Sequence, residues 1–247
     1  SQFEYSRANQ AVILTPFLLM GAMSPVTIPA SLVQQIAEAL SGIALSQLIR
    51  PGCPVVFGSF LSNIDMQSGS PMFGTPESAI GLLCTGQIAR HFGLPFRGGG
   101  GLNAAQTVDA QAGYQTLMTM HATFIAGTNY VLHTAGWLEG GLAMGYEKFV
   151  MDVDQAGMMQ TLLQGVDMTD NGQAMDALRE VGPGKHFLGC NHTQSNFESA
   201  FFRSPLTDNN SFEQWEAEGS KDLTQRANAY WKRQLAEYEA PALDPAI

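Results

Sequence analysis

Short apolar runs recur along the chain at a spacing of roughly 40 residues, and glycine or proline bounds each of them. Runs of this length with such boundaries are typical of buried parallel strands. We therefore expect four or five strands, at Ala11–Leu14, Cys53–Phe57, Leu94–Phe96, Tyr130–His133 and His186–Leu188.

Longer segments between these runs carry helix signals. A proline opens the segment 29–40, and its apolar residues recur at helical spacing. Thr75 is a capping residue for a segment that runs to His91, and a third segment follows Asp109 as far as Gly127. Strands that alternate with helices in this way predict βα units and a parallel sheet.

Two α/β architectures fit this alternation, a doubly wound sheet and a (β/α)8 TIM-type barrel. The loops at 58–74 and 98–106 are long and rich in Gly, Ser and Met. Barrels build their active sites from the loops that follow the strands, which favours the barrel. Four or five strands cannot close an eight-stranded barrel, so we expect either that the chain supplies only about half of one or that two copies complement each other.

The C-terminal part of the chain differs in kind. We expect residues 1–200 to form the barrel part and residues 201–247 to form a charged helical extension. Ser211 caps a predicted amphipathic helix that continues to Glu239, and this helix either packs on the barrel exterior or docks a partner. Its candidate apolar contacts are Trp215, Leu223, Tyr230, Trp231 and Leu235.

Charge is scarce and unevenly distributed. Charged residues make up 14% of the chain, against about 25% in an average protein, while hydrophobic residues make up 45%, which excludes a disordered chain. The net charge of −10 argues against binding to phosphate backbones. Residues 1–150 hold 12 of the charges and residues 151–247 hold 22. The first part is therefore expected to be mostly buried or covered by something else.

The cysteines and the first residues indicate the cellular compartment of the protein. Cys53, Cys84 and Cys190 are too few for a disulfide framework or a structural zinc site, and an odd number fits a reducing compartment. The longest apolar run, 11–23, is shorter than the roughly 20 residues that a membrane-spanning helix needs. The first residues lack the basic region of a secretory signal, so we expect a cytoplasmic protein. The first residue is not methionine, and we expect the sequence to be a fragment.

A run of glycines follows the expected strand at Leu94–Phe96. Arg97 precedes Gly98, Gly99, Gly100 and Gly101. The run lacks both the spacing of a dinucleotide fingerprint and the lysine of a P-loop. Three interpretations remain: a phosphate-binding loop, a strained turn that lets a bulky planar ligand approach, and a flexible loop.

The five histidines form no metal-binding motif, so we expect no metal site. His133 and Glu139 flank the end of an expected strand, where barrels place catalytic groups. His186 and His192 belong to a denser cluster of functional residue types at 182–193. A structural histidine is the alternative for each of them.

The segment 65–78 leads into a helix N-terminus, whose free N–H groups suit a carboxylate or another anion. Glu77 in that first turn can instead face a cationic substrate, and a plain helix cap is the alternative. Aromatic residues either line an apolar cavity or belong to the core, and aromatic faces attract quaternary ammonium groups. These residues include Phe57, Phe60, Phe73, Tyr114 and Trp137.

An ordered set of short motifs links these features. They are Gly69-x-x-x-Phe73-Gly-Thr-Pro-Glu77, Phe92-Gly-Leu-Pro95, Gly98-Gly, Asp109-Ala-Gln-Ala-Gly-Tyr114, Glu147-Lys-Phe-Val-Met-Asp152 and Gly182-Pro-Gly-x-His186-Phe-Leu-x-x-x-His192-Thr. The set resembles the trimethylamine methyltransferase family of corrinoid-dependent enzymes. The resemblance implies a (β/α)8 barrel that moves a methyl group from a methylated amine to the cobalamin of a separate corrinoid protein. Family members are longer, so it also implies that this chain is the C-terminal portion.

The resemblance also implies a choice of methyl donor. Archaeal trimethylamine enzymes of the family carry pyrrolysine, which is absent here, and Ser78 is placed at the equivalent position. Relatives without pyrrolysine include enzymes that demethylate quaternary amines such as glycine betaine, so a quaternary amine or betaine is expected. Asn196 departs from the family pattern, in which another histidine follows His192-Thr.

The site implied by the resemblance combines these residues. Glu77, Ser78, His133 and Glu139 are the expected catalytic groups. Phe73, Tyr114, His186 and His192 are expected to contact the substrate, and Gly98–Gly101 to let the corrin ring of a partner protein approach. A homo-oligomer is expected. An inactive half barrel or binding module, and a barrel enzyme that binds phosphate or flavin at the glycine run, are the alternatives.

Overall fold

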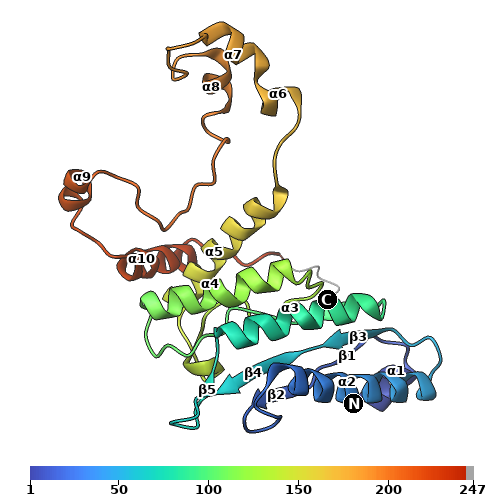
Figure 1. Cartoon of the computed structure of the whole chain (residues 1–247). Helices are drawn as coiled ribbons and strands as arrows, with labels where there is room; N and C mark the ends of the chain where they lie inside the picture. Colours follow the sequence, from blue (N-terminus) through green and yellow to red (C-terminus); the bar gives the residue numbers. More distant parts are fainter. Residues whose placement is uncertain (243–247) are drawn as a thin grey trace.

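The computed structural model describes residues 1–242, which form a mixed α/β fold (Figure 1). The strands are β1 Val12–Leu14, β2 Phe17–Met20, β3 Val55–Gly58, β4 Phe60–Ile64, β5 Pro71–Met72, β6 Phe96–Arg97, β7 Trp137–Leu138 and β8 Ala143–Met144. The helices are α1 Gln2–Arg7, α2 Ile28–Ile49, α3 Pro76–His91, α4 Ala110–Ile125, α5 Tyr146–Gln164, α6 Asp170–Gln173, α7 Met175–Val181, α8 Asn191–Asn196, α9 Phe212–Ala217 and α10 Leu223–Ala236, with a short 3-10 turn η1 at Glu139–Gly141.

In the part of the chain that the structure describes, three of the five strand pairs are parallel, as the alternation predicts, while β5 pairs with β4 and β7 pairs with β8 in antiparallel fashion. The first sheet has the order β1-β3-β6, and β2 pairs with β4 in parallel beside it. Only Thr15 and Pro16 separate β1 from β2, and only Ser59 separates β3 from β4. The segment β1–β2 therefore runs parallel to the segment β3–β4 along its length. Tyr130 bridges Arg97 in parallel on the other side. Four chain segments therefore lie side by side in sequence order.

Two of the expected strands differ from the prediction. The run Tyr130–His133 contributes a single bridge, because its chain turns at His133, where φ is +60°. The strand predicted at His186–Leu188 is wrong. That segment forms a turn between α7 and α8, where Leu188 is exposed and no neighbouring strand pairs with it.

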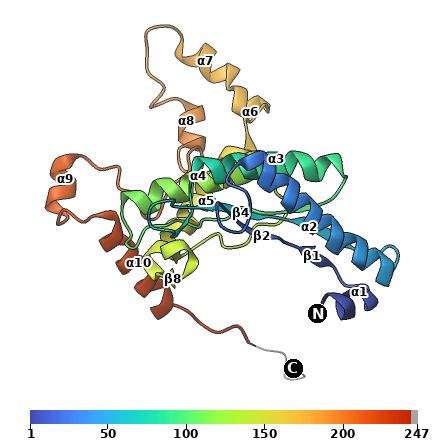
Figure 2. The same cartoon turned by 60° about the horizontal axis from the view of Figure 1, so that its bottom comes forward.

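Helices α2, α3 and α4 lie along one face of the strands (Figure 2). Phe57 and Phe96 point from the sheet into this layer and are fully buried among alanine and leucine side chains of the helices. Local capping residues set where α3 and α4 begin. Thr75 accepts from the Ser78 N–H at 3.2 Å to cap α3, and Asp109 caps α4 in the same way.

Helix α2 extends to Ile49, nine residues beyond the predicted end at Leu40. Among residues 1–242 it is the one helix that is long and apolar enough to cross a membrane, by length and composition only. Its polar residues instead join it to the rest of the layer. The buried Gln35 donates to Thr85 at 3.0 Å and accepts from Ser59 at 2.7 Å.

The C-terminal part leaves the sheet and returns to it. Helix α5 leads into an arm formed by α6, α7 and α8, and α10 then packs back against α5 (Figure 1). The single helix predicted from Ser211 to Glu239 is wrong, because the chain turns at Gly219 and Ser220 with positive φ. The division at residue 200 stays a prediction, and residues 243–247 of the expected extension lie outside the described residues.

Candidate functional site

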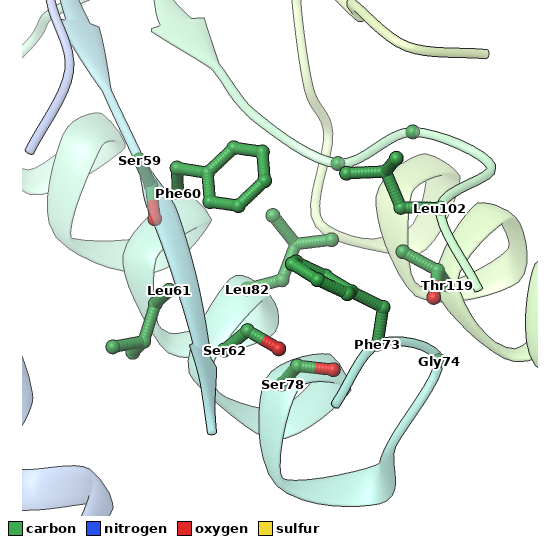
Figure 3. A pocket seen from close by; sticks show the side chains of 12 residues that line it. Ser59, Phe60, Leu61, Ser62, Phe73, Gly74, Ser78, Leu82, Leu102 and Thr119 are labelled. Carbon is green, nitrogen blue, oxygen red and sulfur yellow. The ribbon is translucent and has the colours of Figure 1, made fainter. Parts of the chain in front are cut away.

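Two adjoining cavities open where β4, β6 and the following loops meet. The larger has a volume of about 470 Å³ and is lined by Arg97. Successive side chains of a strand point to opposite faces, and Phe96 points toward the helices, so this cavity lies on the other face of the sheet. The smaller, about 50 Å³, lies between β4, the start of α3 and the glycine run (Figure 3). Phe60 and Leu102 line both cavities, so the two form one site.

An aromatic cluster surrounds Phe60. Its ring stacks on Phe17 with centroids 4.8 Å apart and meets Phe73 edge-on at 5.7 Å. His133 lies 5.9 Å from Phe60 and 5.4 Å from Trp137. These five rings form a surface whose faces suit an alkylated ammonium group.

Arg97 brings a positive charge to the same cavity. Its side chain is only 4% exposed, its Nη1 donates to the Ser59 carbonyl at 3.1 Å, and its Nη2 lies 3.3 Å from His133 Nδ1. Its Nε has no hydrogen-bond partner, and no ion pair among residues 1–242 includes it. A buried guanidinium without a carboxylate partner is suited to an anionic ligand.

The protonation of His133 follows from this neighbour. Burial, and secondarily the positive charge of Arg97, lower the pKa of His133 below its ordinary 6.5. The imidazole is therefore neutral at pH 7, and its Nδ1 accepts from the guanidinium. Burial also lowers the pKa of Arg97, but an arginine starts so high that it stays charged.

The glycine run packs against the chain itself. A Cβ on Gly99 would lie 1.9 Å from Thr123 Oγ1, and a Cβ on Gly100 would lie 2.4 Å from the Leu132 carbonyl. The Gly101 N–H donates to the His133 carbonyl at 2.8 Å, which ties the run to the cavity loop. Gly98, Gly100 and Gly101 are buried, so the flexible-loop interpretation is wrong. Close packing of the chain's own backbone accounts for these glycines.

A buried polar network supports the site from behind. Lys148 and Asp152 on α5 form an ion pair with side chains 1% and 6% exposed. Lys148 Nζ also donates to Thr116 Oγ1 at 2.9 Å, and Asp152 accepts from the Gly136 N–H at 2.8 Å. Both residues belong to the motif Glu147-Lys-Phe-Val-Met-Asp152, and a Lys–Asp pair four residues apart at the end of a charge-poor region is the sequence signal for such a pair.

The structure brings some of the expected site residues together. Phe73 and Ser78 line the smaller cavity with Gly99 and Gly100, and His133 lines the larger one. The Ser78 hydroxyl donates to the Thr75 carbonyl at 2.8 Å, within the helix cap. Phe60 and Trp137, expected as cavity or core residues, line the larger cavity. Arg97, which lines the larger cavity, was not among the expected site residues.

Other expected residues lie outside both cavities. Glu77 and Glu139 are exposed, on the first turn of α3 and in the loop after β7. Tyr114 is 60% exposed on the outer side of α4. His186 and His192 belong to the arm, where His192 Nε2 contacts the Asn171 carbonyl at 2.9 Å. Among residues 1–242, no group of three or more His, Cys, Asp or Glu side chains is arranged to hold a metal ion.

Comparison with known proteins identifies relatives over almost the whole chain. The family model described as trimethylamine methyltransferase matches residues 2–247. A glycine betaine methyltransferase from Desulfitobacterium hafniense strain Y51 is 44% identical over 243 residues, which cover 98% of this chain and 50% of the relative.

Two relatives named for trimethylamine are more distant. Trimethylamine methyltransferase MttB2 from Methanosarcina mazei is 32% identical over 98% of this chain and 48% of its own length. Trimethylamine methyltransferase MttB from Desulfitobacterium hafniense strain DCB-2 is 34% identical over 91% of this chain and 45% of its own length. The chain thus spans about half the length of the curated relatives it matches.

Proposed function

The chain belongs to the trimethylamine methyltransferase family, and from this premise we propose that it is part of an enzyme that demethylates a quaternary amine carrying a carboxylate. Glycine betaine is the favoured donor, because the glycine betaine methyltransferase of Desulfitobacterium hafniense shares 44% of its residues with this chain over the matched length. The proposed acceptor is the cob(I)alamin of a separate corrinoid protein. We place the reaction in the cytoplasm, which the free thiols of Cys53, Cys84 and Cys190 support.

One observation carries the choice of donor: the buried, incompletely paired Arg97 lies beside the aromatic cluster. A betaine has both groups that this cavity suits, a trimethylammonium for the rings and a carboxylate for the guanidinium. Trimethylamine lacks the carboxylate and would leave the arginine charge uncompensated. Sites with a buried polar group reject ligands that cannot pair with it.

We propose that residues 1–200 form about half of a (β/α)8 barrel. The parallel segments follow one another in sequence order, and among residues 1–242 the helices α2, α3 and α4 cover one of their faces. On the other face, Ile13, Phe17 and Tyr130 are between 38% and 48% exposed. The rest of a full-length enzyme would cover this face, which also explains why residues 1–150 carry so few charges.

The proposed reaction needs little acid–base catalysis from this chain. A quaternary nitrogen leaves as a neutral amine, so no residue has to protonate it. Cob(I)alamin, when its carrier protein is bound, supplies the nucleophile that accepts the methyl group. The chain's own residues bind and orient the donor: Arg97 holds the carboxylate, and the rings of Phe60 and Trp137 hold the ammonium group and exclude water.

The size of the site agrees with this division of roles. A cavity of about 470 Å³ suits a small donor. The glycine run packs against Thr123 and Leu132, so we assign the approach of the corrin to the open mouth of the cavity beside Phe17 rather than to Gly98–Gly101.

A donor panel tests the proposal. Full-length enzyme would be mixed with cob(I)alamin and either glycine betaine, trimethylamine or tetramethylammonium, and methylcobalamin would be followed by absorbance. We expect glycine betaine to react at least ~100-fold more efficiently than trimethylamine, since only it pairs with Arg97. Equal or faster reaction with trimethylamine would overturn the choice of donor. Transfer from none of the three, with glycine betaine still bound, would favour a binding module instead.

A further inference from the structure

One buried ion pair connects two of the loops that line the larger cavity. Of the ion pairs among residues 1–242, Lys148–Asp152 is the one in which both side chains are buried. Both residues belong to α5, and neither lines the cavities. Their contacts instead reach the loop that carries His133 and the glycine run that follows Arg97.

The first branch of the network runs through Asp152. One carboxylate oxygen binds Lys148, and the other accepts from the Gly136 N–H at 2.8 Å. Gly136 has a φ of +89° and stands between His133 and Trp137, so this bond fixes the turn that aims both rings.

The second branch runs through Lys148. Its ammonium group donates to Thr116 Oγ1 at 2.9 Å, and the Thr116 hydroxyl in turn donates to the Gly101 carbonyl at 3.1 Å. Asn103 cross-links the branches, because its amide donates to the Trp137 carbonyl at 2.7 Å and to Thr116 at 3.4 Å.

Stability alone does not account for this arrangement. Burial raises the pKa of Asp152 and lowers the pKa of Lys148, so in both residues it disfavours the charged form. Apolar residues of similar volume commonly stabilise a protein as well as a buried ion pair does, or better. An ion pair supplies what apolar residues lack, namely directional bonds to Gly136 and Thr116.

We propose that Lys148 and Asp152 are positioning residues that hold the turn at Gly136, so that His133 and Trp137 face Arg97 across the cavity. The inference rests on the proposed function for the identity of the ligand, but not for the geometry of the loop. Asp152 acts by fixing the backbone of the turn, and Lys148 acts by orienting Asp152 and Thr116.

The test uses the full-length enzyme with the pair replaced by apolar residues, Lys148→Met with Asp152→Leu. This double variant leaves no uncompensated buried charge and is expected to fold. Its matched control is Leu32→Ala, which weakens a core cluster on α2 away from the loops. The parent, the double variant and the control would all carry Trp215→Phe and Trp231→Phe, so that Trp137 is the one tryptophan left in this chain. Any tryptophan in the rest of the enzyme would also be replaced by phenylalanine, so that the fluorescence reports on Trp137.

Two measurements separate positioning from stability. We expect the double variant to shift Trp137 fluorescence and to weaken glycine betaine binding by roughly tenfold to a hundredfold in calorimetry, while Leu32→Ala changes neither. Unchanged fluorescence and affinity in the folded double variant would overturn the proposal, as would equal losses in Leu32→Ala. If the parent enzyme does not bind glycine betaine, the proposed function fails, and the Trp137 signal still decides the positioning role.

Discussion

Replacing Gly86 with alanine is expected to destabilise the protein, although alanine is the better helix former. Gly86 lies inside α3, where this helix packs against the end of α4. A Cβ at this position would lie 2.3 Å from the carbonyl oxygen of Ala126. The obstacle is backbone rather than a side chain, so it cannot move aside by changing rotamer.

Two opposing contributions set the magnitude. Alanine in a helix interior gains about 0.5–1 kcal/mol over glycine. Forcing an extra methyl group into a packed interior costs about 1–3 kcal/mol. The Ala126 carbonyl also accepts from the Arg90 guanidinium, so turning it away would break that bond. The middle values of these two ranges differ by roughly 1 kcal/mol, so we expect Gly86→Ala to lower the free energy of unfolding by about 1 kcal/mol, and loss of the Arg90 bond adds to this.

Gly113 on α4 provides the matched control. It is also helical, and a Cβ there has no neighbour within 4 Å. Gly113→Ala should therefore stabilise by about 0.5–1 kcal/mol. Urea unfolding of the parent and both variants, followed by circular dichroism, measures both changes. If Gly86→Ala stabilises the protein as Gly113→Ala does, α3 and α4 do not approach as described, and the reasoning is refuted.

Three further predictions follow from single contacts. Phe57→Ala should lower the free energy of unfolding by about 3–5 kcal/mol in urea titrations, because Phe57 is fully buried in the main core; a loss below 1 kcal/mol would contradict that placement. In NMR, the pKa of His133 should lie below 6.5 in the folded protein. The unfolded chain then binds a proton at His133 more readily than the folded protein does, so the free energy of unfolding should fall as the pH is lowered from 6.5 to the folded pKa. A His133→Phe variant should lose this pH dependence. The pKa of Glu147 should lie below 4.5, mainly because its carboxylate accepts a hydrogen bond from the Trp231 indole and secondarily because it accepts one from Asn228. Trp231→Phe should raise this pKa, and an unchanged pKa would show that the indole bond is absent in solution.

Local chemistry explains which parts of the fold were predictable. Thr75 and Ser211 cap their helices as expected, and the helix expected after Asp109 begins there, because a cap depends on three or four neighbouring residues. Strand continuation was not predictable in the same way. In the sequence, Pro16 and Ser59 interrupt the apolar runs that predict strands. In the structure, the parallel pairing continues beyond them, from β1 and β3 to β2 and β4.

The site depended more strongly on long-range contacts. Arg97 and His133 are 36 residues apart and meet because β6 and the next segment lie in parallel. Glu77 and Glu139 have suitable chemistry and positions next to expected elements, but tertiary packing leaves both exposed. Phe73 and Tyr114 were both expected to contact the substrate, and no local pattern distinguishes them. Phe73 lines the smaller cavity, whereas Tyr114 is exposed on the outer side of α4.

Arg97 is proposed to bind the carboxylate of the methyl donor and so to select glycine betaine. The most direct test is the ratio of kcat/KM for glycine betaine to kcat/KM for tetramethylammonium in full-length enzyme, measured by methylcobalamin formation. We predict a ratio above ~100 in the parent enzyme and in an Arg50→Met control, because the exposed Arg50 side chain donates to the Arg7 carbonyl and lines neither cavity. Arg97→Met should bring the ratio close to one by lowering glycine betaine turnover alone. A ratio that stays above ~100 in Arg97→Met would show that Arg97 does not select the donor.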